Sequence, residues 1–252
     1  MTHPFDLHGR VALVTGANTG LGQGIAVALA QAGADIAAVG RSAPAQTEAE
    51  VTRLGRRCKW IEASLDSIAP VQGVVDAALA AFGTIDILVN NAGTIRRSDA
   101  LDFSEEDWDA VMDVNLKTVF FLSQAVARAW VAQSRGGKIV NIASMLSFQG
   151  GIRVASYTSS KSGVLGLTRL LANEWAAKGI NVNSIAPGYF ATNNTEALRN
   201  DEARNKAILE RIPAARWGKP SDLGGAAVFL SSAASDYVNG AVLPVDGGWL
   251  AR

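Results

Sequence analysis

Short apolar runs alternate with longer segments of helical periodicity along almost the whole chain. The runs that predict strands are residues 11–15, 35–39, 59–61, 85–89, 138–142, 181–185 and 241–245. The segments that predict helices are residues 21–32, 68–82, 105–133, 157–178 and 221–231. Because the strands are apolar on both faces, we expect helices to cover both sides of a parallel sheet. The alternation predicts an α/β fold with a doubly wound, seven-stranded parallel sheet of the Rossmann type.

One polar stretch, residues 188–217, interrupts this alternation. It contains Asn193-Asn194-Thr195 and a charged, helix-like segment over residues 196–211. Ligands of open α/β sheets bind beyond the carboxyl ends of the strands, and this stretch follows such an end. We interpret it as a lid over a substrate, and a plain surface excursion is the alternative. No linker or repeat is visible, so residues 1–252 are predicted to form one domain.

The composition argues against several classes of protein. The 23 basic and 23 acidic residues leave no formal net charge, whereas proteins of nucleic acids or membrane surfaces normally carry a basic excess. Cys58 is the only cysteine, and the two histidines, His3 and His8, share the N-terminal segment, so neither a disulfide nor a structural zinc site is expected. Residues 1–10 lack the pattern of a signal peptide, and no run is long enough to span a membrane. We therefore expect a soluble, cytoplasmic protein without nucleic-acid or membrane partners.

Tyr157 and Lys161 lie four residues apart, with Ser144 thirteen positions upstream of the tyrosine. Residues four apart share one face of a helix, so an ammonium group can lie beside a phenol. A nearby positive charge lowers the pKa of a phenol, which brings it closer to neutral pH. A serine that can hydrogen-bond a carbonyl oxygen completes a plausible pair for proton transfer in carbonyl and alcohol chemistry.

A glycine-rich turn follows the first predicted strand, with Gly16, Gly20 and Gly22 in the spacing Gly-x-x-x-Gly-x-Gly. Glycines at such a turn let the backbone approach a pyrophosphate, and the amides of the following helix supply partial positive charge. The segment 90–93, Asn-Asn-Ala-Gly, ends the fourth strand at the same edge of the sheet. Its amides could pack against an adenosine ribose or against the strand backbone.

The joint pattern resembles the short-chain dehydrogenase/reductase family, over essentially the whole chain. It consists of the glycine spacing, the segment 90–93, Asn115, Ser144, Tyr157 and Lys161. The resemblance implies that Tyr157 is the catalytic acid/base and that Lys161 lowers its pKa and holds the nicotinamide ribose. It also implies that Ser144 orients the substrate carbonyl and that Asn115 anchors a water of the proton relay. The cofactor-binding residues that it implies are Gly16, Asn18, Thr19, Gly20, Leu21, Gly22, Arg41, Leu65, Asn91, Ala92, Gly93, Tyr157, Lys161, Pro187, Gly188 and Thr192.

The residues at the end of the second strand leave the choice of cofactor open. NAD-dependent relatives usually place an acidic residue there to bind the ribose 2′-hydroxyl. This chain has Gly40 followed by Arg41, and an arginine can pair with the 2′-phosphate of NADP. The closest family resemblance favours NAD, so the cofactor is expected to be NAD or NADP. No metal is expected, because the hydride comes from the cofactor.

Four further segments resemble a branch of the family that acts on deoxy or keto sugar acids in pectin and uronate breakdown. They are residues 144–153, 186–194, 211–218 and 245–252. Arg96, Arg97 and Arg153 could each pair with a sugar-acid carboxylate or lie solvated at the surface, and Arg153 is favoured for its proximity to Tyr157. Gln149 and Asn193 are candidates to bind substrate hydroxyls.

We therefore expect hydride transfer between a nicotinamide cofactor and a sugar acid. The alternatives within the family are a 3-oxoacyl-carrier-protein reductase, for which no basic docking cluster is visible, and another polyol or sugar dehydrogenase. A catalytically silent dinucleotide-sensing protein is the alternative outside enzymes. The resemblance also implies a homotetramer built on residues 105–133 and 157–178.

Overall fold

The structure is a computed structural model that describes residues 3–252; of the predicted domain, residues 1 and 2 lie outside the described part. The strands are β1 (Val11–Thr15), β2 (Asp35–Gly40), β3 (Cys58–Glu62), β4 (Ile87–Asn90), β5 (Gly137–Ile142), β6 (Ile180–Pro187) and β7 (Val242–Val245). The α-helices are α1 (Gly20–Gln31), α2 (Ala45–Arg53), α3 (Val71–Phe82), α4 (Glu105–Met112), α5 (Thr118–Ala132), α6 (Ala155–Trp175), α7 (Glu196–Asn200), α8 (Glu202–Arg211) and α9 (Gly224–Ser231).

All seven strands form one parallel sheet in the order β3-β2-β1-β4-β5-β6-β7. The chain builds outward from β1 to β3, returns to place β4 beside β1, and continues to β7 at the other edge. The direction of winding therefore reverses between β1 and β4, and ligands of open α/β sheets bind at the carboxyl ends of the strands on either side of such a reversal. The predicted doubly wound, seven-stranded sheet is confirmed.

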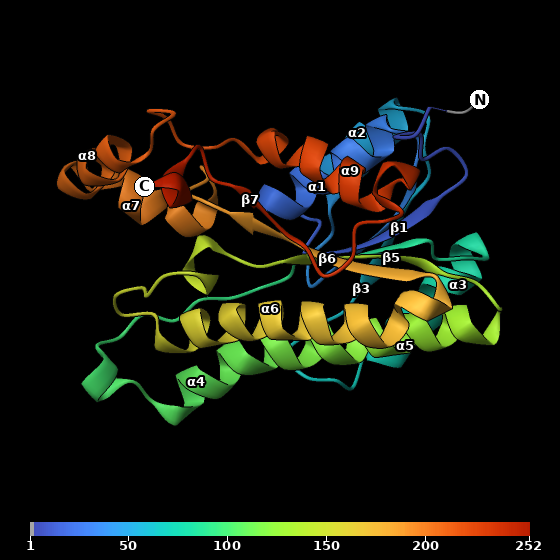
Figure 1. Cartoon of the computed structure of the whole chain (residues 1–252), viewed down its shortest axis with the longest axis horizontal. Coiled ribbons are helices and arrows are strands. Elements are labelled where there is room, and N and C mark those ends of the chain that lie inside the picture. The colour runs from blue at the N-terminus through green and yellow to red at the C-terminus, as the bar shows by residue number, and fades with distance from the viewer. Residues whose placement is uncertain (1–2) are drawn as a thin grey trace.

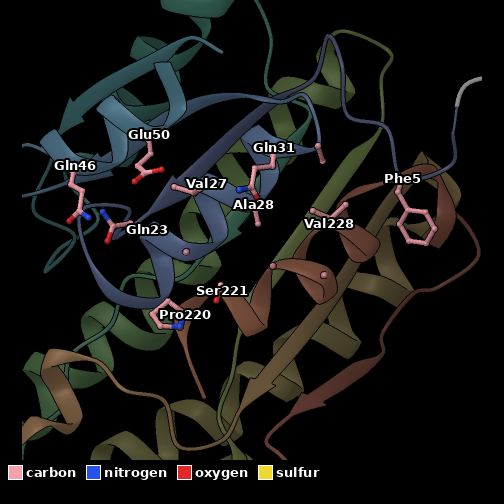
Figure 2. Close-up of a pocket in the computed structure, with 14 residues that line it drawn as sticks. Phe5, Gln23, Val27, Ala28, Gln31, Gln46, Glu50, Pro220, Ser221 and Val228 are labelled. Carbon is pink, nitrogen blue, oxygen red and sulfur yellow. The ribbon is translucent and has the colours of Figure 1, made fainter. Parts of the chain in front are cut away.

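Helices cover both faces of the sheet: α1, α2 and α9 lie on one side, and α4, α5 and α6 lie on the other (Figure 1). The short helices α7 and α8 project beyond one end of the sheet, beside the C-terminus (Figure 1). A groove of about 780 Å³ runs between α1, α2 and α9, lined by residues such as Gln23, Glu50 and Pro220 (Figure 2). None of its lining residues belongs to the predicted site, so the groove is a feature of the outer helical layer.

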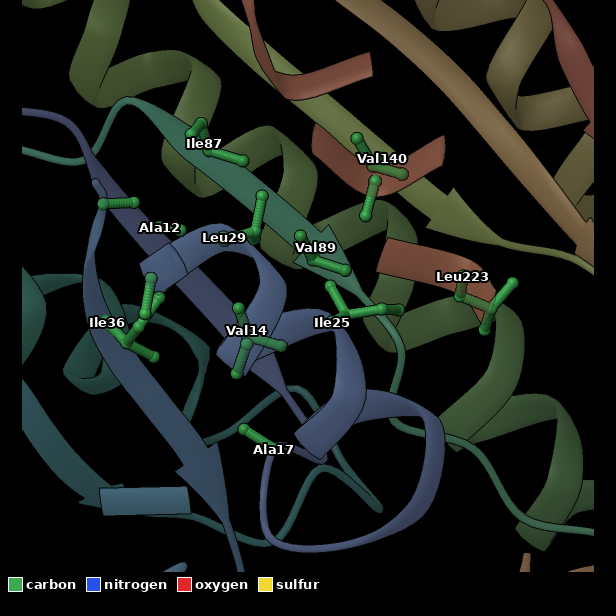
Figure 3. Close-up of a cluster of buried hydrophobic side chains, with 14 of the residues drawn as sticks. Ala12, Val14, Ala17, Ile25, Leu29, Ile36, Ile87, Val89, Val140 and Leu223 are labelled. Atoms are coloured by element: carbon green, nitrogen blue, oxygen red, sulfur yellow. The ribbon is translucent and has the colours of Figure 1, made fainter. Parts of the chain in front are cut away.

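The core consists of two apolar layers, one on each face of the sheet. Figure 3 shows the first, in which Ile25 and Leu29 of α1 pack over Val14 of β1 and Ile36 of β2. Each of these side chains is fully buried, and the second layer, which includes Leu13 of β1 and Leu88 of β4, covers the opposite face in the same way. The sheet is therefore held rigidly, and the loops at its carboxyl edge are placed by it.

The structure differs from the prediction in two elements. Helix α2 was not predicted, because only Thr47 and Val51 of its nine residues are buried and the segment carries little apolar periodicity. The predicted helix over residues 105–133 is divided by a π-helical turn at Asp113–Lys117 between α4 and α5. Such wide turns are rare and often lie at functional sites.

Two absences hold for the part of the chain that the structure describes. No helix among residues 3–252 is long and apolar enough to cross a membrane. In the same residues, no three or more His, Cys, Asp or Glu side chains come together in a group that could hold a metal ion.

Candidate active site

The loops that follow β1 and β4 are joined directly to each other. The Thr15 hydroxyl accepts hydrogen bonds from the amides of Asn91 (3.0 Å) and Ala92 (2.9 Å). The Asn91 side-chain amide donates to the carbonyls of Thr15 (2.9 Å) and Gly16 (3.3 Å). The sequence leaves two partners open for the amides of residues 90–93, an adenosine ribose or the strand backbone. The side chain of Asn91 binds the strand backbone. Its role is to hold the glycine-rich turn against the end of β4.

The glycine-rich turn has the shape that a phosphate-binding turn requires. Gly16 and Gly20 have φ values of +66° and +58°, in the region that favours glycine. A Cβ atom on Gly22 would lie 2.2 Å from the carbonyl oxygen of Gly16, so only glycine fits there. Thr19 is the N-cap of α1, and its side chain makes no capping hydrogen bond. The first amides of α1 are thus available to an anion, which fits the pyrophosphate of a dinucleotide.

The chain has an arginine at the end of β2, where NAD-dependent relatives usually have an acidic residue that binds the ribose. Gly40 ends the strand, and the exposed Arg41 follows it. Asn18, from the glycine-rich turn, donates to the hydroxyl of Ser42 at 2.8 Å, which brings the two loops together. Arg41 therefore belongs to a loop that contacts the glycine-rich turn, and the chemistry of its guanidinium fits a 2′-phosphate. Leu65, predicted on the adenine side, is buried, and its carbonyl accepts from Thr118 at 3.1 Å.

The segment after β6 reaches back to the glycine-rich turn. Pro187 ends β6, and a Cβ atom on Gly188 would lie 2.7 Å from the Cα atom of Asp246, so this position is tightly enclosed. The methyl carbon of Thr192 would lie 3.5 Å from a Cβ atom on Gly20. Thr192 therefore lies against the start of α1, which brings the segment after β6 to the glycine-rich turn.

Asn115 lies in the π-helical turn and is fully buried. Its side chain accepts from the amide of Thr94 (2.8 Å) and donates to the carbonyl of Thr94 (2.9 Å). It also donates to the hydroxyl of Ser160 at 3.3 Å, and Ser160 donates to the carbonyl of Tyr157 at 2.9 Å. The wide turn thus directs Asn115 inward, where it joins the loop after β4 to the helix that carries Tyr157.

Ser144, Tyr157 and Lys161 come together at the carboxyl end of β5. The Lys161 ammonium lies 5.8 Å from the centre of the Tyr157 ring and donates to the carbonyl of Ile142 at 2.6 Å. The Ser144 hydroxyl accepts from the amide of Leu146 at 3.1 Å and lies near enough to the Tyr157 phenol to lower its pKa. The two residues of α6 therefore share one face of the helix, as their spacing predicted.

Burial dominates the titration of both groups on α6. It raises the pKa of Tyr157, and the nearby Ser144 hydroxyl and the charge of Arg97 only oppose this rise. Burial also lowers the pKa of Lys161 to about 8. Burial thus favours the neutral form of both groups. The groups that act on the pKa of Tyr157 in this structure are its buried surroundings, Ser144 and Arg97, so the expected lowering by Lys161 stays a prediction.

Comparison with known proteins agrees with this geometry. Residues 16–250 match the family model described as enoyl-(acyl carrier protein) reductase. The chain is 64% identical to the 2-dehydro-3-deoxy-D-gluconate 5-dehydrogenase of Escherichia coli (strain K12) over 248 residues. This alignment covers 98% of each of the two chains. The chain belongs to the short-chain dehydrogenase/reductase family.

Solved structures of the family include relatives that hold NADP. One, from Agrobacterium tumefaciens, is described as a 2-deoxy-D-gluconate 3-dehydrogenase with bound NADP; it is 63% identical, covers 100% of both chains and has a TM-score of 0.94. Another is a gluconate 5-dehydrogenase from Burkholderia cenocepacia J2315 in complex with NADP and tartrate. It is 42% identical, covers 99% of this chain and 98% of its own, and also has a TM-score of 0.94.

Among the three candidate arginines of this family member, two are paired with carboxylates. Arg96 contacts Asp107 at 3.1 Å, and Arg153 contacts Asp99 at 3.3 Å. Within residues 3–252, Arg97 has no acidic partner within 4 Å; it donates to the carbonyl of residue 194 at 3.4 Å. Arg97 is also the arginine whose charge acts on the pKa of Tyr157. Of the three, Arg97 is therefore the one that pairs with no carboxylate in the described residues, and the arginine that binds the substrate stays a prediction.

The other predicted substrate residues differ in how they are engaged. The side-chain carbonyl of Gln149 accepts from the indole of Trp249 (3.0 Å) and from Arg211 (3.5 Å). The amide of Gln149 is thus oriented by its neighbours, as a hydroxyl-binding group should be. Asn193 is exposed at the start of the polar segment 188–217.

Two serines in the site were not singled out from the sequence. Ser160 bridges Asn115 and Tyr157 as described above. The hydroxyl of Ser147 accepts from the amide of Ser144 (3.3 Å) and donates to the carbonyl of Lys161 (2.7 Å). The spacing of Ser144 and Ser147, three residues apart, is that of a capping box and could have indicated this contact.

Proposed function

We propose that this chain acts as a 2-dehydro-3-deoxy-D-gluconate 5-dehydrogenase, an NAD(P)-dependent oxidoreductase that interconverts a hydroxyl and a ketone of a sugar acid. The observation that carries the proposal is the convergence of Ser144, Tyr157 and Lys161 at the edge of the sheet that bears the glycine-rich turn. The identity of 64% over nearly the whole chain supports this substrate class.

The bound cofactor would supply or accept the hydride at the substrate carbon. The neutral, buried Tyr157 is suited to give a proton to the developing alkoxide, and the Ser144 hydroxyl donates a second hydrogen bond to the same oxygen. Because Ser144 Oγ already accepts from the amide of Leu146, its own proton is directed toward the site. Lys161 is held by the carbonyl of Ile142, where its ammonium can hold a ribose hydroxyl.

We further propose a preference for NADP over NAD. Arg41 supplies a guanidinium beside the glycine-rich turn, and Gly40 leaves no carboxylate there to bind a ribose 2′-hydroxyl. The Agrobacterium relative with bound NADP supports this choice.

For the substrate carboxylate we propose Arg97, in place of Arg153. Its guanidinium is not neutralised by a carboxylate in the described residues, and its charge acts on Tyr157. Gln149 and Asn193 remain the proposed partners of the substrate hydroxyls.

The proposal is tested by following absorbance at 340 nm with NADPH or NADP and three kinds of substrate. The first is the sugar acid, supplied as 2-dehydro-3-deoxy-D-gluconate for oxidation with NADP or as its C5 ketone for reduction with NADPH. The others are a neutral polyol and an acetoacetyl thioester. Arg97→Ala should raise KM for the sugar acid about tenfold or more, since a charge-assisted hydrogen bond contributes about 1.5–3 kcal/mol. Arg153→Ala, a matched control at an arginine paired with Asp99, should change KM less than threefold.

Two alternatives give different outcomes in the same assay. Faster turnover of the acetoacetyl thioester would favour a 3-oxoacyl-carrier-protein reductase, an activity that a 39% identical relative from Vibrio cholerae bears in its name. Cofactor binding with no turnover of any substrate would favour a dinucleotide sensor. An equal rise of KM in both arginine variants would refute the role of Arg97.

The proposal also includes a lid, a homotetramer and a cytoplasmic location. The lid is residues 188–217, where Ile208 of α8 and Ile212, which follows that helix, pack in one apolar cluster with Met145 and Trp249. The tetramer is supported by apolar side chains left exposed on the outer faces of α5 and α6, such as Val131 and Leu170. Sedimentation of the purified chain tests the assembly. The cytoplasmic location rests on the single cysteine, which suits a reducing compartment.

A further inference from the structure

The side chain of Ser147 ties the loop that carries Ser144 to the backbone of helix α6, beside the hydrogen bond of the Lys161 ammonium to the carbonyl of Ile142. Ser144 is the N-cap of a short 3-10 turn, Met145–Ser147, and the two serines form a capping box. The Ser147 hydroxyl accepts from the amide of Ser144 at 3.3 Å and donates its only proton to the carbonyl of Lys161 at 2.7 Å. One oxygen atom therefore links the backbone of both residues that flank Tyr157 in the site.

We propose that Ser147 is a positioning residue, which sets the distance of the Ser144 hydroxyl from the Tyr157 phenol by tying the Ser144 turn to α6. Ser147 is half-buried and does not touch the reacting atoms, so it acts only through Ser144. A hydrogen bond between two segments restrains their relative position only while both partners are present. This role rests on the proposed function, because it requires Ser144 to hydrogen-bond the substrate oxygen.

The orientation of Ser144 explains why the restraint matters. Its Oγ atom accepts from the amide of Leu146 at 3.1 Å, in the same turn, so a movement of the turn moves the hydroxyl with it. Tyr157 is carried by α6, a 21-residue helix whose inner face is buried. Without Ser147, the loop can shift relative to this rigid helix. A misplacement of about 1 Å at a reacting centre can reduce the rate by about a hundredfold.

A double-mutant cycle tests the proposal, with Ser147→Ala, Ser144→Ala and the double variant. With saturating cofactor and the sugar acid, Ser147→Ala should lower kcat about tenfold and leave the KM for NADP within twofold. In the Ser144→Ala background, the same change should lower kcat less than twofold, because the group that it positions is gone. Ser162→Ala, at an exposed serine of α6, is the matched control and should leave kcat unchanged.

The melting temperature of each variant separates positioning from general stability. A structural role alone would give the same loss of kcat with or without Ser144, and that result overturns the proposal. A loss of less than twofold in the otherwise unchanged enzyme also overturns it. If Ser147→Ala does not fold, Ser147→Cys takes its place, because it keeps the shape but donates and accepts only weakly. Absence of turnover in the unaltered enzyme would instead count against the proposed function.

Discussion

The buried ammonium of Lys161 should make the stability of this protein depend on pH in a defined direction. The side chain is about 5% exposed, and burial lowers its pKa from 10.5 to about 8. A difference of about 2.5 pKa units corresponds to about 3 kcal/mol, at 1.36 kcal/mol per unit. This is the free energy by which the protonated group disfavours the folded state at neutral pH.

The sign follows from the protons bound by each state. Between pH 8 and pH 10.5 the unfolded chain keeps the proton of Lys161 while the folded chain has lost it. The free energy of unfolding therefore rises with pH in this window and is lowest below pH 8. From pH 7 to pH 9.5, a single site with these two pKa values adds about 2 kcal/mol.

The perturbation is Lys161→Met, which keeps the length of the stem and removes the charge. It also leaves the carbonyl of Ile142 without its partner, at a cost of about 1–3 kcal/mol that does not vary with pH. The assay is urea unfolding of both proteins at one protein concentration and several pH values. The stability of the lysine protein relative to the methionine variant should increase by about 2 kcal/mol from pH 7 to pH 9.5. A relative change below about 0.5 kcal/mol would refute the reasoning.

Other variants examine the proton donor, the cofactor turn and the cofactor preference. Tyr157→Phe should lower kcat at least about a hundredfold with the Kd for NADPH within twofold; substantial remaining turnover would require another acid. Because burial raises the pKa of Tyr157, ketone reduction should be faster at neutral pH and alcohol oxidation should accelerate as the pH rises; opposite profiles in initial rates would contradict this. Gly22→Ala should weaken NADPH binding at least about tenfold, since its Cβ would lie 2.2 Å from the carbonyl of Gly16, and calorimetry measures the Kd. Arg41→Ala should raise KM for NADP about tenfold and for NAD less than twofold; equal changes would remove Arg41 from the 2′-phosphate role.

Much of the fold could be predicted from the sequence because each buried strand is a short apolar run between helical segments. The strand at Val11–Thr15 matches its prediction, and the others agree to within a few residues. Helix α2 was not predicted because only Thr47 and Val51 of its residues are buried, which leaves too few apolar positions to show a helical period. The π-helical turn at Asp113–Lys117 was not predicted either. It accompanies the hydrogen bonds of Asn115 with Thr94, a residue distant from it in the sequence.

The sequence predicted which side chains come together in the candidate site better than it predicted how burial shifts their pKa values. Spacing alone placed Tyr157 beside Lys161, because that relation is local to one helix. The direction of the Tyr157 pKa depends on burial, which only the packed structure reveals. The preference for Arg153 followed from its proximity in sequence, whereas its ion pair with Asp99 depends on how two loops meet.

Aromatic side chains at the base of the segment 188–217 carry a practical consequence. The ring of Tyr189 lies 5.4 Å from Trp217 and 4.9 Å from Trp249, and the guanidinium of Arg211 lies 4.1 Å from the Trp249 ring. Any opening of this segment would separate Trp249, one of the chain's six indoles, from Tyr189 and Arg211 and change its emission. The protein thus carries an intrinsic optical probe of that motion, which can be read in stopped flow without an added label.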